Sequence, residues 1–99
     1  MPEYSHEDAA LFAEAILGKD AEEFFNSQIG RFVLARAMEE VEDAREELEK
    51  PDTEDDPVKV KALLRKIRSA KDAISWLNEA IRAGNTAVQI LEQRREEGE

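Results

Sequence analysis

Apolar residues recur at helical spacing along most of the chain, and valine and isoleucine never alternate with the period of two that a strand requires. Two long series carry the clearest signal. The first is Gly30, Leu34, Ala37, Val41, Ala44 and Leu48; the second is Val60, Leu63, Ile67, Ala70, Ile74, Leu77, Ile81, Gly84, Val88 and Leu91. Both alternate steps of three and four residues, the spacing of a heptad seam through which one helix packs on another. We therefore predict an all-α protein.

Capping residues and glycine divide the N-terminal third of the chain. Gly18 is a typical residue just past a helix end, so a first helix is predicted at 6–17. Asp20 followed by Glu23 resembles a capping box, which predicts a short helix at 21–26. Ser27 can cap a new helix. We therefore favour a fresh start at 28 over a kinked helix that runs on through Gly30.

Two prolines bound an acidic stretch in the middle of the chain. The first seam predicts a helix at 28–50, and the stretch 51–56 that follows Lys50 reads as an acidic loop. Pro57 is well placed at the first position of a helix, with Asp56 as its cap. The second seam then predicts a long helix at 57–95, and the whole chain, 1–99, is expected to form a single helical domain.

The two long helices are expected to form an antiparallel hairpin, because a short loop joins them. Charge supports this register: residues 39–56 hold eleven acidic and two basic residues, whereas 58–71 hold six basic residues and no acidic one. The hairpin would neutralise the basic block internally; alternatively, the block stays free as an anion-binding patch. Helix 57–95 is longer than helix 28–50, so its C-terminal half extends beyond the hairpin. The two short N-terminal helices are expected to pack on that half.

A second apolar series accompanies the main seam within residues 73–91. Its members follow steps of 3, 4, 3, 4 and 3: Ala73, Trp76, Ala80, Ala83, Ala87 and Ile90. Either both stripes pack within the chain, or the second packs on another subunit, with Gly84 allowing close approach. These six residues and Gly84 are the candidate partner interface. Gly84-Asn85 could instead end the helix, but both stripes keep their phase across it, which favours a continuous helix.

Few residues are suited to chemistry. The chain has no cysteine and one histidine, which excludes disulfides, thiolate metal sites and a Ser-His-Asp triad within one chain. It has no glycine-rich phosphate loop, and its acidic turn lacks the spacing and the glycine of an EF-hand. We expect no enzyme, no catalytic residues, no metal site and no cofactor.

Charge and hydropathy narrow the range of partners. With 24 acidic and 14 basic residues the net charge is −10, which disfavours nucleic-acid binding, since that depends on phosphate neutralisation by Lys and Arg. No apolar run is long enough to span a membrane, and the first residues are acidic where a signal peptide is basic. We expect a soluble, cytoplasmic protein with a protein partner.

Three motifs stand out in the sequence: Ser-x-Ile-Gly-Arg, Arg-Ala on the same predicted helix, and Trp-Leu-x-x-x-Ile-x-x-Gly near the end. Their residues are Ser27, Ile29, Gly30 and Arg31; Arg36 and Ala37; and Trp76, Leu77, Ile81 and Gly84. In these motifs the chain resembles a group of small acidic proteins encoded in tailed-bacteriophage genomes, which typically show all three. The likeness runs from residue 24 onward, about two thirds of the chain. It implies a phage setting, in the bacterial host cytoplasm or the virion, and no particular activity.

Two hypotheses of function follow. In the first, the chain is a phage protein that self-associates and docks on a larger protein as a structural or assembly component. In the second, it is an acidic effector that binds a basic host or phage protein and imitates DNA charge, because residues 1–57 hold 5 basic and 18 acidic residues whereas 58–99 hold 9 basic and 6 acidic ones. A third and weaker hypothesis is nucleic-acid binding through Lys59 to Lys71.

Overall fold

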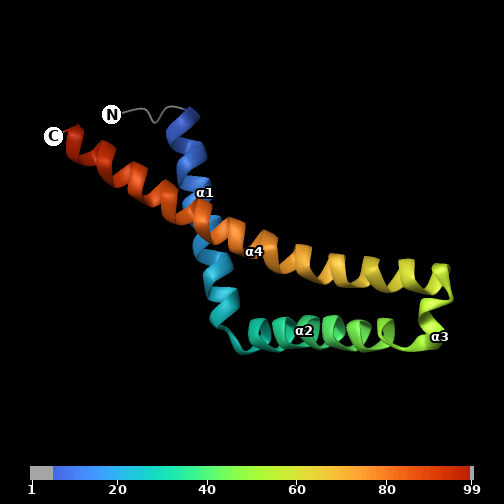
Figure 1. The fold of residues 1–99 in the computed structure, drawn as a ribbon. Helices are drawn as coiled ribbons and strands as arrows, with labels where there is room; N and C mark the ends of the chain where they lie inside the picture. Colours follow the sequence, from blue (N-terminus) through green and yellow to red (C-terminus); the bar gives the residue numbers. More distant parts are fainter. Residues whose placement is uncertain (1–5, 99) are drawn as a thin grey trace. The chain divides into compact units, whose positions relative to one another are not determined.

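The computed structural model describes residues 6–98, and all regular secondary structure within that range is helical. The elements are α1 (His6–Asn26), α2 (Gln28–Leu48), α3 (Pro51–Glu54) and α4 (Pro57–Glu97) (Figure 1). The predicted all-α class is confirmed.

The described residues fall into two compact units rather than one. Unit 1 comprises residues 6–26 and 77–98, and unit 2 comprises residues 27–76. The helix α4 contributes to both units, its first half to unit 2 and its second half to unit 1. The expectation of a single helical domain stays a prediction, because compact units are not by themselves separate domains.

The helix α1 is continuous, so the predicted break between 6–17 and 21–26 is wrong. Gly18 lies inside the helix and is buried, and no described glycine has a positive φ. The residues least exposed to solvent on α1 follow one helical stripe through this point: Leu11, Ala15, Gly18, Ala21, Phe24 and Phe25. The apolar phase thus continues across Gly18, which packs against another helix instead of ending its own.

Unit 1 is built on a contact between two glycines. A Cβ added at Gly18 would lie 2.6 Å from the Cα of Gly84 and 2.7 Å from the carbonyl oxygen of Ala80. A Cβ added at Gly84 would lie 2.7 Å from the Cα of Gly18. The backbones of α1 and α4 therefore meet at a distance that only glycine permits on both sides. The predicted role of Gly84 in close packing is confirmed, and so is the continuity of α4 through Gly84-Asn85.

Capping fixes both ends of α2. Ser27 has an extended backbone, and its hydroxyl oxygen accepts a hydrogen bond from the Gly30 amide at 2.9 Å, as the predicted start at 28 requires. The helix ends at Leu48, two residues before the predicted end. Lys50 is extended because the ring of Pro51 disfavours helical backbone in the residue that precedes it.

The predicted loop 51–56 contains one helical turn, α3, at the junction of α2 and α4 (Figure 1). Pro51 occupies the first position of α3, where a helix does not need the backbone N–H that proline lacks. The carboxylates of Asp52 and Glu54 lie in this first turn, where the helix dipole stabilises negative charge. The next helix starts as predicted: the amide of Lys59 donates to Asp56 Oδ1 at 3.2 Å. The loop prediction failed because proline and acidic residues suit a first helical turn as well as a loop.

The core of unit 2 follows the predicted seams. On α2, Gly30, Val41 and Ala44 are buried, and the other three seam residues are half-buried. On α4, the five seam residues from Val60 to Ile74 are half-buried. Thr53 of α3 joins this core at 1 % exposure. Its hydroxyl has no hydrogen-bond partner among residues 6–98.

Replacement of Gly84 by alanine tests the glycine contact. We expect Gly84→Ala to lower the free energy of unfolding by about 1–3 kcal/mol, because its Cβ forces two helix backbones apart. Thermal melting followed by circular dichroism measures the effect, with exposed Thr86→Ala as the control on the same helix. At an open helical site Gly→Ala stabilises by about 1 kcal/mol, so a raised Tm for Gly84→Ala contradicts the contact.

Replacement of Thr53 by valine tests the buried hydroxyl. The isosteric methyl removes an unsatisfied polar group, so we expect Thr53→Val to stabilise the fold by about 1 kcal/mol in chemical denaturation. Thr86→Val, at an exposed site, should change the stability by less than about 0.5 kcal/mol. Destabilisation by Thr53→Val would mean that the hydroxyl makes a useful hydrogen bond.

Candidate interaction surfaces

The predicted interface residues divide into covered and exposed ones. Gly84 and Ala87 are buried within unit 1, with Ala87 at 0 % exposure, and Ala80 and Ile90 are half-buried. The three exposed members of the predicted interface are Ala73, Trp76 and Ala83. Trp76 stands out, since 65 % of this large side chain is accessible. Covered residues cannot reach a partner in this conformation, so the exposed part of the stripe is what remains for another chain.

An apolar groove lies between α1 and α4 in unit 1, beside the glycine contact. It has a volume of about 350 Å³. Its lining residues are Phe12, Ala15, Ile16, Lys19 and Glu22 from α1 and Gly84, Asn85 and Val88 from α4. The groove exists because the glycines bring the backbones together while larger side chains stand on either side. Its walls offer apolar contact and one charge of each sign, and no nucleophile with an adjacent base.

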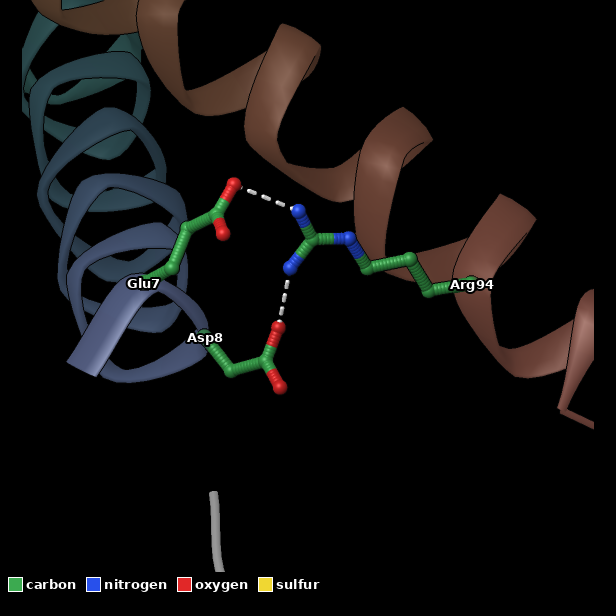
Figure 2. Close-up of polar contacts among 3 residues, drawn as sticks. All are labelled: Glu7, Asp8 and Arg94. Carbon is green, nitrogen blue, oxygen red and sulfur yellow. Dashed lines mark hydrogen bonds and ion pairs between the residues drawn. The ribbon is translucent and has the colours of Figure 1, made fainter. Parts of the chain in front are cut away.

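Arg94 joins the C-terminal part of α4 to the first turn of α1. Its guanidinium donates to Glu7 Oε1 at 2.6 Å and to Asp8, one carboxylate for each terminal nitrogen (Figure 2). The hydrogen bonds to Glu7 and Asp8 raise the pKa of Arg94. The two carboxylates also lie at the positive end of the α1 dipole, so this clamp supports the start of the helix.

Glu47 joins α2 to the start of α4 within unit 2. Its carboxylate pairs with Lys50 and with Lys59, each at 2.8 Å. Hydrogen bonds from Lys50 and then from Lys59 lower the pKa of Glu47 to about 2. Hydrogen bonding to Glu47 raises the pKa of Lys50 in turn. These ion pairs therefore link the C-terminal end of α2 to the N-terminal end of α4, on either side of α3.

The basic block is largely unpaired, so internal neutralisation as predicted is limited to Lys59. Five basic side chains are exposed and make no ion pair with any carboxylate of residues 6–98: Lys61, Arg65, Lys66, Arg68 and Lys71. Helical spacing explains the outcome. Lys61, Arg65 and Arg68 lie about one turn apart on the side of α4 opposite its seam, away from the apolar contact that the seam makes.

The sequence analysis did not predict exposed apolar side chains on α2, although Ile29 belongs to one of the motifs. Ile29 and Phe32 are 63 % and 65 % exposed, and Met38 is 52 % exposed. The sequence does indicate this exposure, because these large apolar residues lie outside the seam of their helix. Arg94 was missed as well, although acidic residues at one end of the chain and basic residues at the other indicated the pairing.

Two properties concern residues 6–98 as a whole. No helix in this range combines the length and the hydropathy of a membrane span. Nor do three His, Cys, Asp or Glu side chains gather there in a cluster that could hold a metal ion.

No protein-family model, curated protein or solved structure matches the chain. Inference about function therefore rests on the sequence motifs and on the surfaces described above.

The Glu47 bridge predicts a pH dependence. A carboxyl with a pKa of about 2 in the folded chain and 4.5 in the unfolded chain stabilises the fold above pH 4.5. This contribution is lost as the pH falls from 4.5 towards 2. We expect Glu47→Gln to be less stable than wild type at pH 7 and to lose less stability than wild type over that range, by chemical denaturation.

Glu49→Gln is the matched control, because Glu49 is exposed and makes no ion pair within the described residues. It removes the same charge two positions away. If Glu49→Gln reduces the loss of stability between pH 4.5 and 2 as much as Glu47→Gln does, general charge repulsion within the chain, rather than the Glu47 bridge, causes the pH dependence.

Proposed function

We propose that this chain is a small tailed-phage protein that acts by protein-protein interaction, as a self-associating structural or assembly component. Its role is binding rather than catalysis. The phage setting is supported by the motif residues, from Ser27-x-Ile29-Gly30-Arg31 to Trp76-Leu77. Self-association is supported by the distribution of apolar side chains.

The observation that carries the proposal is the contrast between core and surface. The buried hydrophobic residues of the described chain are Ala21, Val41, Ala44 and Ala87, so the most deeply buried part of the core is made of small side chains, and its larger side chains are only half-buried. Eleven large hydrophobic residues are exposed in the same range, among them Ile16, Phe32 and Trp76 at 63–65 %. Single exposed apolar residues are ordinary, but so many beside so small a core are typical of a protein that completes its packing with a partner.

In the proposed arrangement, α2 and the 57–76 part of α4 form an antiparallel hairpin whose two heptad seams pack together. The helix α1 covers the C-terminal half of α4. The Glu47–Lys59 bridge supports the first contact, and the Gly18–Gly84 approach supports the second. The arrangement leaves the faces opposite the seams free for other chains.

An acidic effector that binds a basic protein is the second candidate function. It is favoured by the carboxylates of α2, of which Asp43 and Glu46 are exposed and make no ion pair within residues 6–98. Such binding would be fast at low salt and weak at high salt, because exposed charges are screened.

Light scattering and mass photometry across micromolar concentrations test the first candidate. We expect concentration-dependent oligomers, and we expect Trp76→Ala to weaken association by about tenfold or more, as loss of a large interface anchor does. Leu17→Ala is the matched control, because Leu17 is also an exposed large apolar residue, at 60 %, but belongs to unit 1. A strict monomer that neither Trp76→Ala nor Ala83→Glu changes would contradict self-association.

The same samples separate the two candidates. An effector of the second kind stays monomeric alone and binds poly-L-lysine, with an affinity that falls steeply as salt rises. Oligomers that form without any added basic partner favour the first candidate.

A further inference from the structure

The helix α2 presents a mixed stripe on the side opposite its seam. We call it the α2 outer face: Phe32, Arg36, Glu39, Asp43 and Glu46. Steps of four and three residues place these side chains on one line, and all five are exposed. The stripe begins with a large aromatic and ends in three carboxylates. Only the weak Arg36–Glu39 pair, at 3.4 Å between two exposed side chains, is made within it.

The helix α4 presents the opposite pattern within the same unit. We call it the α4 outer face: Lys61, Arg65, Arg68, Asp72 and Trp76. These residues also lie opposite the seam, and all are exposed. None of the four charged ones makes an ion pair with another residue of 6–98. The stripe begins with three cations and ends in a large aromatic.

The two outer faces are complementary when they run antiparallel. With Asp43 opposite Arg65, the spacing along each helix sets the remaining pairs to within one residue, or about 1.5 Å. The five pairs are Phe32 with Trp76, Arg36 with Asp72, Glu39 with Arg68, Asp43 with Arg65, and Glu46 with Lys61. Each of the four charged pairs joins opposite signs. Arg36 is the one base on the acidic α2 outer face, and it lies opposite Asp72, the one acid on the basic α4 outer face.

We propose that the α2 outer face binds the α4 outer face of a second copy of this chain, antiparallel and in this register. The inference rests on the proposed self-association and names its surfaces. The partner is a second copy because the two faces of one chain complement each other: the charges of the α2 outer face are opposite to those of the α4 outer face, and each face has an aromatic residue at the matching end. Each copy contributes two different faces, so the contact is heterologous: it leaves one face open at each end and builds either rings or open chains.

The energetics favour a contact that forms only when several pairs act together. A single exposed ion pair contributes little, because solvent and salt screen it. The four pairs also disfavour shifted registers, because a shift by one position loses pairs and brings Arg36 opposite Arg68, or Glu39 opposite Asp72. The Phe32–Trp76 contact adds the apolar anchor that charge alone does not supply. The interface is therefore expected to weaken as salt rises without vanishing.

Charge exchange between the two faces tests the proposal. The first variant carries Arg65→Glu and Arg68→Glu, and the second carries Glu39→Lys and Asp43→Lys. We expect each variant alone to associate at least about tenfold more weakly than wild type, since like charges then meet. An equimolar mixture of the two variants should recover association, because the reversed faces complement one another.

The matched control carries Lys66→Glu and Lys71→Glu. It makes the same change in net charge in the same basic block, but off the α4 outer face. We expect it to associate like wild type. Circular dichroism confirms the fold of each variant, and light scattering at low and at physiological salt follows assembly.

The outcomes separate this inference from the function on which it rests. Oligomers that persist in both face variants, or a mixture that fails to recover, overturn the proposed faces and leave self-association through another surface. A wild type that stays monomeric at every concentration overturns both. Equal weakening by the Lys66/Lys71 control shows that net charge alone governs association and overturns the register. Binding of a DNA oligonucleotide that only the Arg65/Arg68 variant loses, with self-association unchanged, assigns the α4 outer face to nucleic acid instead.

Discussion

The close approach of helix backbones through small residues is the constraint on which the rest of this structure depends. In unit 1 the contact is glycine on glycine, Gly18 against Gly84, with Ala21 and Ala87 buried nearby along the same helices. In unit 2 the buried seam residues of α2 are Gly30, Val41 and Ala44. Helices that meet through such residues bury backbone and methyl groups rather than large side chains.

The same constraint accounts for the surface. A large side chain cannot enter a contact that only glycine or alanine fits, so it lies at the margin or on the opposite side of its helix. The groove of unit 1 is one result, with Phe12, Ile16 and Val88 standing around the glycine contact. In unit 1 the small-residue contact and the exposed apolar side chains beside it are thus one property rather than two. The exposed Phe32 and Trp76 of unit 2 lie on helix faces opposite their seams.

Sequence reasoning was most successful where a periodic seam and a cap agreed. Ser27 and Asp56 start α2 and α4 as predicted, and the seam residues are the least exposed ones on both helices of unit 2. It failed at Gly18, because a glycine after an apolar stripe is compatible both with a helix end and with a tight crossing. The phase of the apolar stripe distinguishes the two, because it continues unbroken across Gly18 as it does across Gly84. The pairing of charges was harder to foresee. Opposite blocks on two helices neutralise each other only where the side chains flank the seam, and half of the basic block (Lys61, Arg65 and Arg68) lies on the opposite side of α4.

The division of the chain between the two units has a consequence for how it folds. Unit 2 is contiguous, so its contacts close short loops, through the turn at α3. Unit 1 is assembled from the two ends of the chain, and its Asp8–Arg94 pair joins residues 86 positions apart. The entropy lost on closing so long a loop is smaller once the intervening residues are already folded. On this argument unit 2 is expected to fold first, and the packing of α1 on the C-terminal half of α4 is expected to follow.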